Sequence, residues 1–103
     1  MKVTIITPCY NSAPYIATTI KSVQQQTFTD WEMIIVDDGS TDNSATIVSE
    51  IAKIDLRIKL IQKENGGSAS ARKLGLSLAQ GEYIHFLDAD DMLKKNVLLK
   101  VSA

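Results

Sequence analysis

Three aspartates within four positions are the residues of this chain best placed to do chemistry. Asp88, Asp90 and Asp91 follow an apolar run in the stretch HFLDADDM, which spans residues 85–92. In an extended backbone, side chains two positions apart leave on the same side, so we expect Asp88 and Asp90 to lie close together. Two carboxylates about 4 Å apart repel by roughly 4 kcal/mol at an effective dielectric constant of about 20. Such a pair needs a proton or a cation.

A divalent metal ion is the simplest cation to place at these carboxylates. Their oxygens are hard ligands without a histidine or cysteine partner, which favours Mg²⁺ or Mn²⁺ over Zn²⁺. His85 is flanked by Ile84 and Phe86 in an expected strand. We interpret it as a packed or hydrogen-bonded histidine and not as a metal ligand. The sequence therefore predicts a magnesium or manganese site at Asp88 and Asp90.

A second acidic stretch, VDDGSTDNS at residues 36–44, ends another apolar run. One interpretation is a turn in which Asp, Gly, Ser and Asn occupy their usual positions. The other is that Asp38, the last residue before the turn, accepts hydrogen bonds from a ribose hydroxyl or from the N–H edge of a base, as the acidic residue of dinucleotide folds does. The stretch by itself favours neither interpretation.

Two further stretches carry residues that suit a nucleotide. In NGGSASARKLG, residues 65–75, the two glycines match no phosphate-binding pattern, so a structural turn is the favoured interpretation. Arg72 in the following helix is placed either to contact a nucleotide, to pair with a carboxylate, or to lie solvated on the surface. Tyr10, just after Pro8, is suited to stacking on a base or to packing against the first helix.

The pattern of apolar residues predicts the scaffold that positions these side chains. Short apolar runs predict strands at residues 2–7, 31–38, 57–62 and 82–88. Helical spacing separates them at residues 16–23, 48–52 and 71–78, and Val97, Leu98 and Val101 indicate one more helix. This alternation predicts a Rossmann-like layered α/β domain with a mostly parallel four-stranded sheet flanked by helices. The carboxyl ends of its strands then share one edge, where open sheets bind ligands.

Composition limits the classes of partner. The 103 residues suit one small domain, and 11 basic residues balance 12 acidic ones without a basic run, which argues against nucleic-acid binding. Cys9 is the only cysteine, so we expect a small buried apolar residue, no internal disulfide and a cytoplasmic chain. The apolar run before Pro8 is too short for a signal peptide, and we expect no membrane span. Attachment of a longer protein to the inner face of a membrane stays open.

Four blocks in order, ITPCYN, QTFTDWEMIIVDDGSTDNS, ENGGSASARKLGL and GEYIHFLDADD, closely resemble the N-terminal half of family 2 glycosyltransferases with the GT-A fold. The resemblance runs from about Val3 to Leu93. It implies an inverting hexosyl transferase whose donor is a nucleotide-diphospho-sugar, a UDP-sugar by family habit. It also implies a divalent cation, Mn²⁺ or Mg²⁺. The acceptor, whether a glycan, a lipid carrier or a protein, stays open.

The resemblance also implies roles for single residues at the nucleotide end. Pro8 and Tyr10 match the loop that lines the base, and Asp38 matches the acid that contacts uracil or ribose. Arg72 matches an arginine that precedes an asparagine in the family. Lys73 replaces that asparagine here and adds positive charge near the diphosphate.

At the phosphate end, the segment Asp88, Ala89 and Asp90 matches the DXD motif. In the family the last aspartate ligates the cation that bridges the diphosphate, and the first contacts ribose or the water shell of the metal. Asp91 extends the motif. The catalytic base of the family is an acidic residue of the second half, which has no counterpart before Ala103.

We therefore expect residues 1–103 to form the nucleotide-diphospho-sugar-binding part of a GT-A domain, truncated at its C-terminal end and inactive alone. A sheet that stops after its fourth strand leaves an open edge, which predicts a homodimer or a tendency to aggregate. One alternative is a receiver-like signalling domain, suggested by IIVDDGS, but its acidic residues after the first strand are missing. Another is a non-catalytic interaction module, against which the intact Asp88 and Asp90 argue.

Overall fold

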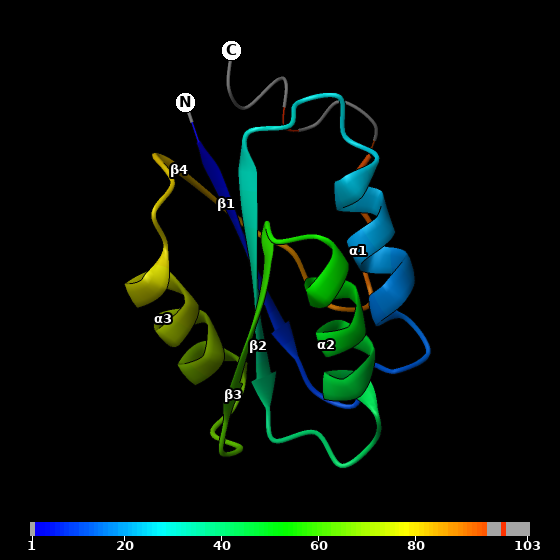
Figure 1. Cartoon of the computed structure of the whole chain (residues 1–103). Helices are drawn as coiled ribbons and strands as arrows, with labels where there is room; N and C mark the ends of the chain where they lie inside the picture. Colours follow the sequence, from blue (N-terminus) through cyan, green and yellow to red (C-terminus); the bar gives the residue numbers. More distant parts are fainter. Residues whose placement is uncertain (1, 95–97, 99–103) are drawn as a thin grey trace.

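The computed structural model describes residues 2–94 and 98. Its elements run in the order β1 (Val3–Cys9), α1 (Ile16–Gln24), β2 (Trp31–Asp38), α2 (Ser44–Ile54), β3 (Ile58–Lys63), α3 (Ser68–Leu78) and β4 (Tyr83–Phe86). The sheet has the strand order β3-β2-β1-β4, and each of these neighbouring pairs is parallel. Figure 1 shows α1 and α2 on one face of the sheet and α3 on the other. The predicted α/β architecture is confirmed.

Apolar side chains fill both spaces between sheet and helices. The larger cluster lies between the sheet and helices α1 and α2, and its strand members include Ile5 and Met33. The smaller cluster lies under α3 and contains Ile34, Val36 and Ala71. Every residue of β2 is buried, as expected for a central parallel strand covered on both faces. The core thus fixes the strand ends from which the polar loops depart.

Helix α3 contacts the sheet through a glycine. A Cβ at Gly75 would lie 2.6 Å from the Cγ2 atom of Ile6 and 3.4 Å from the Cγ2 atom of Val36. Real Cβ atoms essentially never show the first of these distances, so no larger residue fits without a shift of the helix. Gly75 therefore sets the height of α3 above β1 and β2.

Glu32 is a buried acid at the amino end of β2. Its Oε2 atom accepts hydrogen bonds from the Thr4 hydroxyl and from the Gln80 N–H, both at 2.6 Å, and its Oε1 atom lies 3.1 Å from the Lys59 ammonium. Burial raises the pKa of Glu32, but these donors outweigh it and hold the pKa below its ordinary value. Through Gln80, Glu32 fixes the connection between α3 and β4.

Strand β4 forms the end of the sheet next to β1. The strand was expected to reach residue 88, and it ends at Phe86 because the chain turns soon afterwards. Tyr83 and Phe86 are about half exposed, as expected for an uncovered edge. Whether this edge pairs with a second copy stays a prediction. The helix expected at Val97 and Val101 lies outside the described residues.

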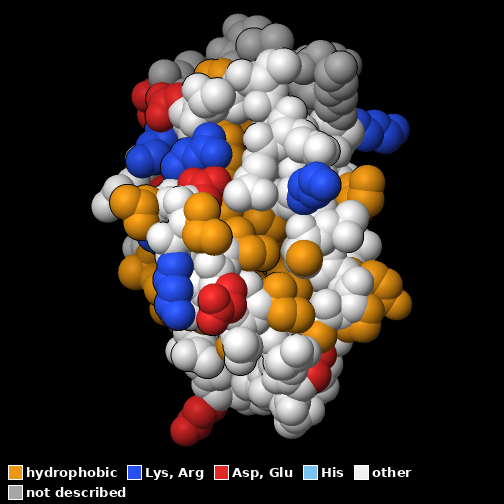
Figure 2. All heavy atoms as spheres, turned by 45° about the vertical axis from the view of Figure 1, so that its right-hand side comes forward, with side chains coloured by type: hydrophobic (Ala, Val, Ile, Leu, Met, Phe, Trp, Pro, Cys, Tyr) orange, Lys and Arg blue, Asp and Glu red, His pale blue; other side chains and the backbone are white. Residues whose placement is uncertain are grey.

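Figure 2 shows the side of the molecule on which α2 and α1 lie, with Lys and Arg side chains scattered among acidic and apolar ones and not gathered in one patch. Within the part of the chain that the structure describes, no helix has the length and apolar character that crossing a membrane requires.

Candidate functional site

The carboxyl ends of β1 and β2 and the loop after β4 enclose a cavity of about 300 Å³. Its lining residues are Pro8, Cys9, Tyr10, Asn11, Ser12, Tyr15, Asp38, Ser68, Asp88, Ala89 and Asp90. Of the residues that sequence analysis assigned to substrate binding, all but Arg72 are in this lining. The predicted edge of the sheet is therefore where the candidate residues meet.

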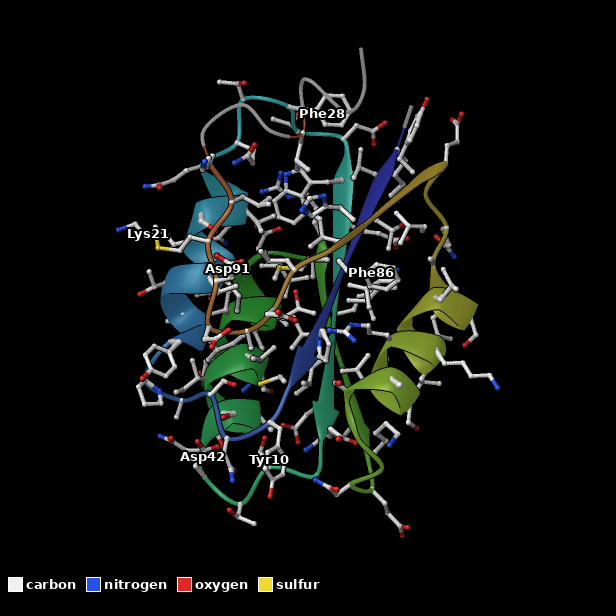
Figure 3. The ribbon with its side chains drawn as sticks, turned by 180° about the vertical axis from the view of Figure 1, so that it is seen from behind. Tyr10, Lys21, Phe28, Asp42, Phe86 and Asp91 are labelled. Atoms are coloured by element: carbon white, nitrogen blue, oxygen red, sulfur yellow. The ribbon has the colours of Figure 1, made fainter. Side chains whose placement is uncertain are left out.

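Tyr10 lines the cavity on the loop after β1, and hydrogen bonds to the segment after β2 hold this loop in place. Figure 3 shows Tyr10 and Asp42 together at the carboxyl end of the sheet. The next residue, Asn11, has a φ of 48° and accepts a hydrogen bond of 2.8 Å from the Thr41 N–H through its Oδ1 atom. The Ser44 hydroxyl accepts a bond of 2.9 Å from the Ser12 N–H. These contacts join the loops after β1 and β2 and leave the Tyr10 ring half exposed.

The carboxylate of Asp38 accepts three hydrogen bonds from the segment at and after the end of β3. Its Oδ1 atom accepts hydrogen bonds of 2.9 Å from the Lys63 ammonium and from the Gly66 N–H, and its Oδ2 atom accepts one of 2.9 Å from the Gly67 N–H. The bond from Lys63 is the main reason why the pKa of Asp38 lies below its ordinary value. The two glycine N–H groups thus bind a carboxylate of the chain itself, which agrees with the structural-turn interpretation of this stretch.

Arg72 pairs with a carboxylate, one of the options the sequence left open. Its Nη2 atom lies 3.3 Å from the Oδ1 atom of Asp88. The Arg72 side chain is 40% exposed and that of Asp88 62%, so solvent screens the pair and it adds little to stability. Arg72 therefore contacts Asp88, a residue of the cavity lining, but is not itself part of that lining.

Asp88 and Asp90, on the loop after β4, both line the cavity. Leu87 and Ala89 are buried while Asp88 and Asp90 are exposed, the alternation expected for an extended stretch. The stretch is nevertheless a turn and not a strand, since the Asp91 N–H donates a bond of 3.0 Å to the Asp88 carbonyl. Both acids still line one cavity.

The carboxylates at the cavity suit a cation that is coordinated partly by the protein and partly by a bound substrate. Within residues 2–94 and 98, no three His, Cys, Asp or Glu side chains come together as a complete metal site. Mg²⁺ characteristically uses one or two protein carboxylates and completes its shell with phosphate oxygens and water. Asp88 and Asp90 supply that number, and among the described residues the Asp90 carboxylate has no hydrogen-bond or ion-pair partner. These residues fit a divalent cation brought together with a phosphorylated ligand.

Sequence analysis missed several residues of the lining. Asn11 lies two residues after the end of β1 and has a positive φ, which asparagine tolerates better than most residues. Ser68 begins α3, and Tyr15 precedes α1. Cys9 is fully buried, as expected, and burial raises the pKa of its thiol to about 11. It is an inert part of the cavity floor.

Comparison with known proteins gives matches over nearly the whole chain. The family model described as "Glycosyl transferase family 2" matches residues 4–102. A curated relative, the putative teichuronic acid biosynthesis glycosyltransferase TuaG of Bacillus subtilis, is 50% identical over 99 residues, which cover 95% of this chain and 39% of the relative. The glycosyltransferase GlyG of Streptococcus pneumoniae is 39% identical over 97 residues, which cover 93% of this chain and 32% of that protein. The chain thus spans well under half of these relatives.

Two solved structures are similar and hold nucleotide sugars. The S. aureus TarS 1-349 structure in complex with UDP-GlcNAc has a TM-score of 0.87 and 36% identity, with 99% of this chain and 30% of that chain covered. The mannosyltransferase PcManGT of Pyrobaculum calidifontis, in complex with GDP-Man and Mn²⁺, has a TM-score of 0.86 and 30% identity, with 94% and 30% covered.

Proposed function

The chain belongs to glycosyl transferase family 2, and from that premise we propose that residues 1–103 form the nucleotide-diphospho-sugar-binding part of a GT-A glycosyltransferase. The observation that carries this proposal is the single cavity lined by Tyr10, Asp38, Asp88 and Asp90. It combines an exposed aromatic ring, a fixed acid and two outward carboxylates. These three kinds of group suit the three parts of a nucleotide-diphospho-sugar: the base, the ribose and a cation-bound diphosphate.

We assign the nucleoside to the end of the cavity formed by β1 and β2. The Tyr10 ring, half exposed beside Pro8, offers an apolar face for a base. Asp38 is held ionised by Lys63, and its Oδ2 atom has acceptor capacity beyond the Gly67 bond for a ribose hydroxyl or a base N–H. A UDP-sugar is the proposed donor, supported by the UDP-GlcNAc complex of TarS, and the GDP-Man complex of PcManGT keeps a guanosine donor as an outcome of the test.

We assign the diphosphate and its cation to Asp88 and Asp90. A diphosphate brings about two negative charges that these carboxylates would repel, so the acids alone exclude it. A bound Mn²⁺ or Mg²⁺ would supply the positive charge that neutralises the diphosphate as donor and as leaving group. Asp90, which has no partner among the described residues, is the proposed ligand, and Arg72 keeps Asp88 in place beside it. The Mn²⁺ in the PcManGT complex supports this assignment.

The transfer step itself needs a residue that we do not assign to residues 1–103. Attack on the anomeric carbon with inversion requires a carboxylate to take the proton of the acceptor hydroxyl. Asp91 lies beside α1 (Figure 3) and is not in the lining of the cavity, so we do not give it that role. Residues 1–103 by themselves bind donor without transferring it. The relative TuaG is named for teichuronic acid biosynthesis, which supports an acceptor in envelope polysaccharide synthesis. A cytoplasmic location is part of the proposal.

Isothermal titration calorimetry with UDP, with and without Mn²⁺, tests this function. We expect binding in the presence of Mn²⁺ and a large loss of affinity when a chelator removes it. Asp90→Asn should abolish the metal dependence, whereas Asp30→Asn, outside the cavity lining, should leave it intact. A folded chain that binds GDP but not UDP would indicate a guanosine donor, and one that binds neither at any Mn²⁺ concentration would favour the non-catalytic interaction module.

A further inference from the structure

Helix α1 directs buried polar side chains toward the loop that carries Asp88 and Asp90. Thr19 and Ser22 lie on one face of the helix, three positions apart, and Gln26 continues the same line just beyond its end. Their exposed fractions are only 1%, 7% and 5%. The face of a helix that packs in a core is ordinarily apolar, so this line of polar groups needs partners.

Thr19 finds its partners on both sides of Asp90. Its Oγ1 atom lies 2.7 Å from the Ala89 carbonyl oxygen and 2.7 Å from the Asp91 carbonyl oxygen. A threonine hydroxyl has one proton to donate, so these two carbonyls share it with the Tyr15 carbonyl, which lies farther away at 3.2 Å. The Ala89–Asp90 and Asp91–Met92 peptide groups, one on each side of Asp90, are thereby fixed to one atom of α1.

Ser22 and Gln26 hold the chain farther along. The Ser22 hydroxyl accepts a bond of 3.0 Å from the Leu93 N–H and donates one of 2.6 Å to the Thr19 carbonyl. The Gln26 amide donates to the Lys94 carbonyl at 3.0 Å and accepts from the Leu98 N–H at 3.2 Å. These two residues fix the segment after the turn, whereas of the three polar side chains only Thr19 contacts the carbonyl groups of both neighbours of Asp90.

We propose that Thr19 is a positioning residue for the Asp90 carboxylate, setting the metal affinity of the cavity from outside it. Because the Asp90 carboxylate has no partner among residues 2–94 and 98, its place is determined by its backbone, and Thr19 holds that backbone. Ala89, the residue before Asp90, is buried in the larger core cluster and anchors the same turn. The role of Thr19 rests on the proposed function, in which Asp90 is the metal ligand.

The test separates positioning from plain stabilisation. Thr19→Val keeps the shape of the side chain and removes the hydroxyl, and Thr19→Ser restores it. Mn²⁺ affinity in the presence of UDP, measured by electron paramagnetic resonance, should fall about tenfold in Thr19→Val, as for other groups that orient metal ligands, and return to within about twofold of wild type in Thr19→Ser. Thr18→Val makes the same chemical change at an exposed neighbouring position and should behave as wild type.

Ser22→Ala is the control for stability. It removes the partner of the Leu93 N–H and lowers the melting temperature, yet leaves the contacts on either side of Asp90, so its Mn²⁺ affinity should stay near that of wild type. If Thr19→Val does not unfold cooperatively, Thr19→Ala takes its place. Equal losses of affinity in the Thr19 and Ser22 variants, or none in Thr19→Val, would overturn the positioning role while the proposed function stands. Wild type that binds no Mn²⁺ with UDP overturns both.

Discussion

The ammonium group of Lys63 lies 2.9 Å from the carboxylate of Asp38, at the point where β2 and β3 end as paired neighbours. The side chains are only 18% and 5% exposed, so the pair is largely withdrawn from water. Removing one partner would leave the other as an uncompensated charge. The ion pair thus keeps Asp38 ionised and fixes it in the cavity wall.

Asp38→Asn should lower the stability of the fold in a pH-dependent way. The loss at pH 7 should be about 1.5–3 kcal/mol, the range for a hydrogen bond to a charged group. Because Lys63 and the two glycines lower the pKa of Asp38, its contribution is complete above the unfolded-state value of about 3.9 and is lost as pH falls through the lower folded-state value. Urea unfolding between pH 7 and pH 2 should show wild type and variant converging below about pH 4. A gap that stays constant down to pH 2 would contradict this cause.

Arg72→Met should weaken donor binding without weakening the fold. The variant releases Asp88, whose partner lies 3.3 Å away, and removes a positive charge from the rim of the cavity. Affinity for UDP with Mn²⁺ should fall severalfold, while the melting temperature changes little because the pair is exposed. Lys53→Met removes a positive charge from a similarly exposed ion pair with Glu50 on α2 and serves as the control. An equal fall in affinity in both variants would indicate a general charge effect.

Glu32→Gln should weaken the fold without weakening donor binding. The single oxygen of an amide can keep the bonds from the Thr4 hydroxyl and the Gln80 N–H, but its NH₂ group cannot accept the bond from the Lys59 ammonium. The free energy of unfolding should therefore fall by about 1–3 kcal/mol. Glu32 lies at the amino end of β2, away from the cavity, so UDP affinity of the folded variant should be unchanged. Glu50→Gln, at an exposed position, should change stability by less than about 0.5 kcal/mol in chemical denaturation.

The Cys9 thiol should resist alkylation in the native chain. Burial and the nearby Asp37 charge raise its pKa from 9.0 to about 11, which lowers the thiolate fraction at pH 8 about 100-fold. Iodoacetamide should therefore label the urea-unfolded chain far faster than the native chain, as followed by mass spectrometry. Native labelling at the unfolded rate would show that the cavity floor opens freely.

The sheet and its functional edge could be predicted because local patterns determine them. Apolar runs predict the strands, and the parallel arrangement then brings the residues after each strand to one end. Asp38 and Asp88 follow from this rule alone. The turn at Ala89 and Asp90 was not predicted, because it depends on Thr19, a contact across 70 and 72 positions of the sequence.

The partners of Asp38 illustrate the same limit. The glycines that bind it are 28 and 29 positions away, and nothing in either stretch predicts that one acid accepts both N–H groups. Asn11 was overlooked for a different reason. Its side chain caps a neighbouring loop and not its own, so its role becomes visible only once β1 and β2 are side by side.

Gly75 affects the rim of the cavity although it lies outside the cavity lining. Arg72 stands one turn before it on α3, so the reach of the guanidinium depends on how low the helix sits. A single methyl group at position 75 would act as a spacer against Ile6, raising α3 and withdrawing Arg72 from Asp88. The absence of a side chain on the sheet-facing side of α3 thus sets how closely Arg72 approaches Asp88 at the rim of the cavity.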